Sequence, residues 1–289
     1  MKYCLDYYRG SQWLDTVDEI NIQFDGSPKQ YKNLIKFLEQ HQKQRVNLCV
    51  AEKNFDMFFE NNNIKILNEM REEYPQYNFA IRFYEIMRQP AADWDLDKRV
   101  KDYLKTAKSL RPRVYLGILV EHASLLHYLL SLDVSEIYIS GYLGFCLHQC
   151  AKDIHNRGCL IRVIPNIVQG DNWIPTIQRF FIRPNDVPYY EDLVDVMEIF
   201  GKEHIPSVIY GAYLDQEWFG PLHELIYNIG SEPLVDNRQL LPIFGEMRTK
   251  CKQRCMFVGN CGICPKLLDI GDALRDKNLV IMKDKKADS

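Results

Sequence analysis

The stretch RVNLCVAEKNFDMFFENNNIKILNEMREEYPQYNFAIRF, residues 45–83, contains a complete strand–helix–strand unit. Arg45–Val50 and Asn78–Phe83 are short runs rich in apolar, β-branched or aromatic residues, and each predicts a strand. The longer segment Phe55–Glu73 between them predicts an amphipathic helix. Two strands joined by a helix are typical of a parallel β-sheet.

The same pattern recurs along the whole chain. Six further runs predict strands: Glu19–Phe24, Arg113–Val120, Glu136–Ser140, Leu160–Pro165, Arg179–Ile182 and Val194–Phe200. Helices are predicted at Tyr31–Gln42, Leu96–Ser109 and His122–Leu132. We interpret the strand runs as nearly continuous apolar ones, which is typical of strands covered on both faces.

Eight strands alternating with helices predict an α/β protein with a distorted (β/α)8 TIM-like barrel and a C-terminal cysteine-rich extension. An open doubly wound sheet is the alternative, because the segment between Ile182 and Val194 is too short for a full helix. The predicted organisation is a barrel domain over residues 1–229, a loop-rich extension over 230–282 and a disordered tail over 283–289. A helix is expected within PLHELIYNI, residues 221–229, just before the extension.

Composition narrows the class of protein. The 289 residues are 46% hydrophobic and carry a formal net charge of −3, so no overall positive field attracts nucleic acid. A local basic patch would be enough for an RNA substrate, so RNA and small-molecule substrates both stay open. No apolar run approaches the ~20 residues that cross a bilayer, and the first ten residues lack the core of a secretory signal. These features predict a cytoplasmic protein without membrane contact, in which nine cysteines stay reduced.

Four of those cysteines are close together in the segment CKQRCMFVGNCGIC. Cys251, Cys255, Cys261 and Cys264 have the spacing C-x3-C-x5-C-x2-C, with a Gly-Asn pair that favours a turn between the two halves. Lysines and arginines flank the segment, and positive charge lowers the pKa of nearby thiols. The sequence therefore predicts one metal site formed by these four thiolates.

The spacing favours a [4Fe-4S] cluster over zinc. Zinc sites with four cysteines usually have two short knuckles separated by a longer span, whereas only Met256–Asn260 separates the halves here. Closely spaced ligands with unequal gaps suit an iron–sulfur cluster, and zinc remains the alternative. The other cysteines are interpreted as buried packing residues: Cys4, Cys49, Cys146, Cys150 and Cys159.

Polar residues follow several predicted strands at their carboxyl ends, where barrels bind ligands. The residues assigned to catalysis are Glu121, Arg183 and Glu198. The residues assigned to substrate binding are His122, Asn166 and Asp186. In this interpretation Arg183 binds an anionic group, and one of the glutamates acts as acid or base. A structural role is the alternative for each; Asp186, for instance, would cap a short helix.

The segments FFIRPNDVPYYEDLVDVMEIFG, residues 180–201, and VIYGAYLDQEWFGPLHELI, residues 208–226, resemble the late part of the collagenase-like, U-type peptidase family. The matching positions are a run Arg183-Pro184-Asn185-Asp186, then Asp195, Glu198 and Gly201, then Tyr213. The resemblance implies a barrel fold. It also implies a relation to iron–sulfur proteins of oxygen-independent or prephenate-dependent hydroxylation, which act on tRNA, rRNA or a quinone precursor.

Together these features predict an iron–sulfur protein that modifies a nucleic acid base or a small aromatic substrate. One alternative is a non-catalytic structural or assembly protein in which zinc on the four cysteines holds the C-terminus together. The other alternative is a peptidase, as the family name implies.

Overall fold

The computed structural model describes residues 1–6, 16–42, 45–51, 54–60, 62–83, 98–116, 123–140, 147–166, 182–200, 206–221, 224–225, 233–234, 237 and 281–282. Eight strands close a parallel barrel in the order β1 to β8. The strands are β1 (Lys2–Asp6), β2 (Glu19–Gln23), β3 (Arg45–Ala51), β4 (Tyr77–Phe83), β5 (Arg113–Leu116), β6 (Glu136–Ser140), β7 (Leu160–Val163) and β8 (Val196–Ile199). The predicted barrel is therefore confirmed, and the open doubly wound sheet is excluded.

The barrel includes a strand that the sequence interpretation missed, Lys2–Asp6. The predicted strand Arg179–Ile182 lies almost entirely outside the described residues. Of the latter run only Ile182 is described, and it lies outside the strands. β1 pairs in parallel with β2, with Cys4 opposite Glu19 and Asp6 opposite Asn21.

The helices are α1 (Pro28–Gln40), α2 (Phe55–Glu60), α3 (Asn63–Glu73), α4 (Lys98–Ala107), α5 (Ala123–Leu130), α6 (Leu147–Asn156) and α8 (Pro206–Asp215), with 3-10 turns η5 (Lys108–Leu110) and η6 (Pro184–Tyr189). The single helix predicted over Phe55–Glu73 is two helices, because Asn62 between them has φ 55°, in the left-handed region. The chain forms α8 earlier than the helix expected within residues 221–229. Of that expected helix only residues 221, 224 and 225 are described.

The strands alternate between polar and apolar residues, which corrects the prediction of nearly continuous apolar runs. In β2, buried Ile20 alternates with buried Glu19 and Asn21. Arg113 of β5 contacts Glu19 of β2, although β3 and β4 separate these strands in the barrel order. A contact between non-neighbouring strands crosses the interior of the barrel. The polar residues of this alternation therefore point inward, and the apolar residues point outward.

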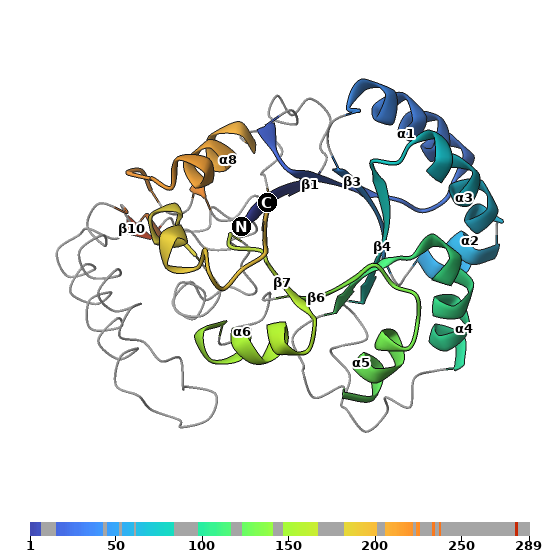
Figure 1. Ribbon diagram of the computed structural model, residues 1–289. Helices are drawn as coiled ribbons and strands as arrows, with labels where there is room; N and C mark the ends of the chain where they lie inside the picture. Colours follow the sequence, from blue (N-terminus) through green and yellow to red (C-terminus); the bar gives the residue numbers. More distant parts are fainter. Residues whose placement is uncertain are drawn as a thin grey trace. The chain divides into compact units, whose positions relative to one another are not determined.

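In the N-terminal part, the apolar core lies between the outer face of the barrel and the helices that cover it. Residues Lys2–Ser140 and Ile154–Arg162 form one compact unit, in which α1, α2, α3 and α4 lie on the outer side of β3 and β4 (Figure 1). Leu34 and Leu38 of α1 and Leu67 of α3 are buried. Burying a leucine side chain contributes about 1.5–3 kcal/mol, so these contacts hold the helices on the sheet.

Residues Gly141–Asp153 and Val163–Ser289, with Met1, form the second compact unit. Its described elements include β8, η6 and α8, and a short antiparallel pair of β9 (Pro233–Leu234) with β10 (Ile281–Met282). The predicted domain boundary after residue 229, most of the extension over 230–282 and the tail over 283–289 lie outside the described residues.

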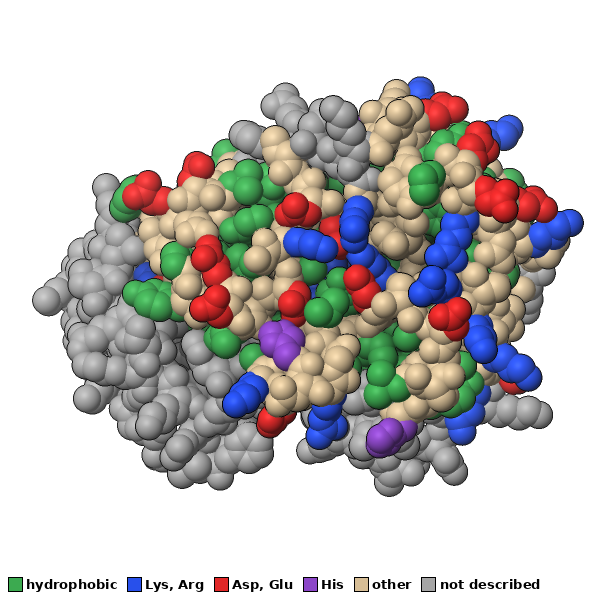
Figure 2. Space-filling view, viewed as in Figure 1, with side chains coloured by type: hydrophobic (Ala, Val, Ile, Leu, Met, Phe, Trp, Pro, Cys, Tyr) green, Lys and Arg blue, Asp and Glu red, His purple; other side chains and the backbone are tan. Residues whose placement is uncertain are grey.

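The described helices include none that is long and apolar enough to cross a membrane. On the face seen in Figure 2, acidic and basic side chains are interspersed, in keeping with the small net charge of −3.

Gly26, just after β2, has φ +82° and lies against the side chain of Asn63. A Cβ at this position would lie 2.3 Å from Asn63 Nδ2, and that amide is fixed by donating to Phe58 O and by accepting from the Tyr31 hydroxyl. We expect Gly26→Ala to lower the free energy of unfolding by about 2–4 kcal/mol, from left-handed backbone strain and overpacking together. Urea unfolding measures the loss.

Gly158→Ala is the matched control. Gly158 has φ +74°, but a Cβ there would meet nothing within 4 Å. Gly158→Ala should therefore lower the free energy of unfolding only by the backbone strain, about 1–2 kcal/mol. Equal losses in the two variants would contradict the steric role assigned to Asn63.

Candidate functional site

The interior of the barrel contains a network of buried charged and amide groups. The carboxylate of Glu19 on β2 accepts two hydrogen bonds of 3.0 Å from Arg113 Nη1 on β5. The Asn47 amide on β3 donates to Glu19 Oε2 at 3.1 Å and to Asn21 Oδ1 at 3.0 Å. All four side chains are at most 2% exposed. Each partner therefore offsets part of the cost of removing the others from water.

Arg113 lies between two carboxylates. Its Nε is 2.8 Å from Glu136 Oε2 on β6, and the Tyr138 hydroxyl donates to the same oxygen at 2.8 Å. Burial raises the pKa of Glu19, but the guanidinium groups of Arg113 and Arg162 and the Asn47 amide outweigh it and hold that pKa below its ordinary value. Burial lowers the pKa of Arg113, and Glu19 reverses that effect and raises it. Both members of the pair are ionised at neutral pH.

A second group of cations surrounds Tyr115 of β5. The Cζ atom of Arg162 on β7 lies 4.7 Å from the centre of the Tyr115 ring, and that of Arg82 on β4 lies 5.4 Å from it. Arg162 Nη2 also donates to the buried Cys4 Sγ at 3.1 Å, and its Nη1 lies 3.9 Å from Glu19 Oε2. This part of the interior is rich in guanidinium groups.

In the second unit, two residues assigned by sequence to different roles are partners of one another. Arg183 Nε and Nη2 donate to the two oxygens of Asp186 at 2.8 and 2.7 Å, and Arg183 Nη1 donates to Asn237 Oδ1 at 2.9 Å. Arg183 and Asp186 are each 1% exposed, and Asn237 is fully buried. Asp186 lies in η6, which begins after Arg183, so this pair fixes a tight turn.

Asn166 and Glu198 are also fully buried in this unit. The Asn166 amide donates to Phe200 O at 2.5 Å and to Leu225 O at 3.1 Å, and its Oδ1 accepts from Phe200 N at 3.1 Å. Asn166 thus ties the segment after β7 to the end of β8. Glu198 lies within β8, as predicted.

The remaining predicted site residues lie outside the described residues: Glu121, His122, Cys251, Cys255, Cys261 and Cys264. Within the described part of the chain, no three His, Cys, Asp or Glu residues are grouped as a metal site. Of the five cysteines interpreted as packing residues, Cys4, Cys49 and Cys159 are buried and form no disulfide among the described residues. The side chains of Cys146 and Cys150 are not described.

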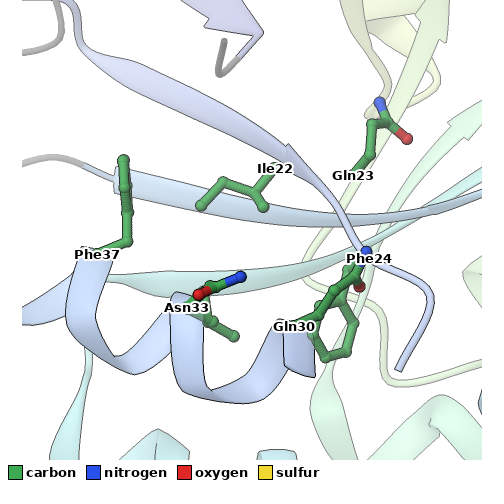
Figure 3. A pocket seen from close by; sticks show the side chains of 7 residues that line it. Ile22, Gln23, Phe24, Gln30, Asn33 and Phe37 are labelled. Carbon is green, nitrogen blue, oxygen red and sulfur yellow. The ribbon is translucent and has the colours of Figure 1, made fainter. Parts of the chain in front are cut away.

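A cavity of about 190 Å³ lies between β2 and α1. Figure 3 shows Ile22, Asn33 and Phe37 lining it, whereas Gln23 points away from the helix. Gln30, also in the lining, already accepts a hydrogen bond from Asp25 N at 2.6 Å. Most of the residues that line the cavity belong to α1 or to the side of β2 that faces α1.

The sequence interpretation missed the interior residues: Glu19, Arg82, Arg113, Tyr115 and Arg162. The signal was present, because EINIQ of β2, RVYL of β5 and LIRV of β7 alternate between interior and helix-facing positions. An alternating parallel strand inside a ring of helices predicts a polar barrel interior.

Comparisons with known proteins support a coarse relation only. No family model matches the chain. A protein of Methanocaldococcus jannaschii, named as an uncharacterized protease, is 35% identical over 100 residues, which cover 32% of this chain and 29% of that protein. The chain thus matches less than a third of that relative, and the match supports a peptidase-like relation.

A solved structure from Pseudomonas aeruginosa, described as a candidate dihydrodipicolinate synthetase, aligns over 78% of this chain and 79% of its own. The TM-score is 0.36 and the identity 11%. The barrel assignment therefore rests on the strand order of this chain itself.

Proposed function

We propose that this chain is an iron–sulfur protein whose barrel binds a small molecule or an RNA base for oxygen-independent hydroxylation or a related modification. The observation that carries the proposal is the segment CKQRCMFVGNCGIC, in which Cys251, Cys255, Cys261 and Cys264 are spaced for one [4Fe-4S] cluster. Such a cluster, when bound, supplies electron transfer. Its thiolates need a reducing compartment, so the proposal includes a cytoplasmic location.

The charged barrel interior supports the substrate-binding half of the proposal. TIM-type barrels usually fill their interior with branched apolar side chains. Here Glu19, Arg82, Arg113 and Arg162 are at most 3% exposed and belong to strands of the barrel. Burying a charged group costs free energy. Groups whose pKa is strongly perturbed by burial and by a charged partner are often found at functional sites.

Anaerobic purification followed by iron, sulfide and zinc analysis tests the cluster. We expect about four irons per chain and broad visible absorption. Both should be lost on joint substitution Cys261→Ser and Cys264→Ser, because two of the four ligands are removed. Cys159→Ser is the control, since Cys159 is a buried free cysteine and should leave the iron content unchanged.

Two results would contradict the iron–sulfur proposal. Stoichiometric zinc without visible absorption would instead support a zinc site that holds the C-terminus together. Iron that survives the double substitution would show that other residues bind the metal.

A peptidase is the second candidate, and the match to the protease-named archaeal protein favours it. Release of fluorescent peptides from labelled casein is the direct test. Cleavage that persists in the double cysteine variant would favour the peptidase, because hydrolysis of a peptide bond requires no electron transfer.

A further inference from the structure

The Tyr115 hydroxyl lies in the barrel interior without a hydrogen-bond partner among the described residues. The side chain is fully buried at the centre of β5. Leaving a buried hydroxyl unsatisfied costs about 1–3 kcal/mol, and native structures contain few such groups. The neighbouring Tyr138 shows the usual situation, because its hydroxyl donates to Glu136 Oε2 at 2.8 Å.

Two cationic groups lie beside the Tyr115 ring. Arg162 and Arg82 place their guanidinium groups 4.7 and 5.4 Å from its ring centre, from two different strands. Each cation is attracted to the ring, but two buried cations at one ring also repel each other. Glu19 lies nearer to Arg113, at 3.0 Å, than to Arg162, at 3.9 Å, and Glu136 also binds Arg113. The printed distances therefore place these two carboxylates closest to Arg113, although Glu19 also acts on the Tyr115 phenol.

The two guanidinium groups and the Tyr115 hydroxyl are all hydrogen-bond donors. Guanidinium groups donate only, and burial keeps the pKa of the Tyr115 phenol well above its ordinary value, so its proton is retained at neutral pH. Donors with positive charge complement a carboxylate or phosphate. Arg82 is the residue before the last in β4, close to the carboxyl end of the strand, which is where barrels bind substrates.

We propose that the barrel interior beside Tyr115 binds a small oxyanion, a carboxylate or a phosphate, to which the Tyr115 hydroxyl donates while Arg82 and Arg162 supply positive charge. The inference names the ligand class of the proposed function and rests on the barrel binding a substrate. It does not rest on the four cysteines. If the protein binds an oxyanion but contains no iron, this inference still holds and the iron–sulfur proposal fails. If the protein contains the cluster but binds no oxyanion, only this inference fails.

Isothermal titration calorimetry with inorganic phosphate in one arm and succinate in the other tests the inference on the full chain. We expect one of the two probes to bind saturably at one site. Tyr115→Phe should weaken that binding about tenfold, as loss of one charge-assisted hydrogen bond does. Without the probe, Tyr115→Phe should leave the unfolding temperature unchanged or raise it, because the substitution removes an unsatisfied buried hydroxyl.

Tyr138→Phe is the matched control, since this tyrosine is equally buried but its hydroxyl is bonded to Glu136. It should lower the unfolding temperature and keep the affinity within about twofold. Arg82→Lys keeps the charge but loses the planar donor pair, and should weaken binding at least about fivefold.

Three outcomes would overturn the inference. The first is no saturable binding of either probe. The second is wild-type affinity in Tyr115→Phe. The third is a loss of stability in Tyr115→Phe as large as in Tyr138→Phe, which would show that water or another group already satisfies the hydroxyl.

Discussion

Replacing Glu19 with glutamine should lower the free energy of unfolding by about 3–5 kcal/mol, because it leaves buried cations without their central carboxylate. Glu19 is fully buried and accepts both hydrogen bonds from Arg113 at 3.0 Å. Glutamine has the same size, so the loss reports charge and not a cavity. Urea unfolding at neutral pH, followed by circular dichroism, measures the change.

The control for this variant is Glu69→Gln. Glu69 lies 3.9 Å from Lys65 on the exposed face of α3, and both side chains are more than half exposed. Surface pairs of this kind contribute about 0.3–0.5 kcal/mol. A Glu19→Gln loss no larger than the Glu69→Gln loss would refute the central role of the carboxylate.

The same variant should change the response to acid. The folded-state pKa of Glu19 lies below its ordinary value, so its contribution is complete above the unfolded-state pKa, about 4.3. The contribution is lost as the pH falls through the folded-state pKa. Below pH ~4, wild-type stability should therefore decline more steeply than that of Glu19→Gln. Parallel pH profiles would contradict the lowered pKa.

Substitution of Asp186 by asparagine is expected to cost a similar amount, about 3–5 kcal/mol, by leaving the Arg183 guanidinium without its carboxylate. Both oxygens of Asp186 accept from Arg183, at 2.7 and 2.8 Å, and both side chains are 1% exposed. Arg183→Gln should be equally damaging. The double variant should cost no more than either single one, because neither charge is then left alone.

Glu191→Gln, in the same region, is the control for this cycle. Glu191 is exposed and accepts a hydrogen bond from Gln216 at 2.6 Å, so its loss should change stability by less than about 0.5 kcal/mol. If Arg183 instead served mainly to bind an anionic substrate, Arg183→Gln would remain as stable as wild type. Unfolding of the three variants in urea distinguishes the two roles.

Most of the fold could be predicted because the outward residues of the strands are strongly apolar. Ile20, Val46, Val114 and Ile161 are fully buried and mark their strands clearly. β1 was missed because KYCLD is short and begins and ends with charged residues. The break between α2 and α3 was missed because it depends on the left-handed conformation of Asn62, which a helical pattern does not show.

The charged interior was harder to predict for a chemical reason. Tyr115, Tyr138, Cys49 and Ala80 count as hydrophobic by type, so they hide part of the alternation in their strands. In the structure they share the interior with arginines and amides. The Arg183–Asp186 pair has a local spacing, but its third member, Asn237, lies 54 positions from Arg183 in the sequence, and no local pattern links them.

Because polar and apolar residues alternate along β2 to β7, each strand has one set of residues that packs against the helices and another set that lines the barrel lumen. The residues that pack against the helices are not the residues that line the lumen, so a lumen side chain can be exchanged without removing an apolar contact to the helices. Each exchange must still preserve the balance of charge inside, because an unpaired buried charge destabilises the fold.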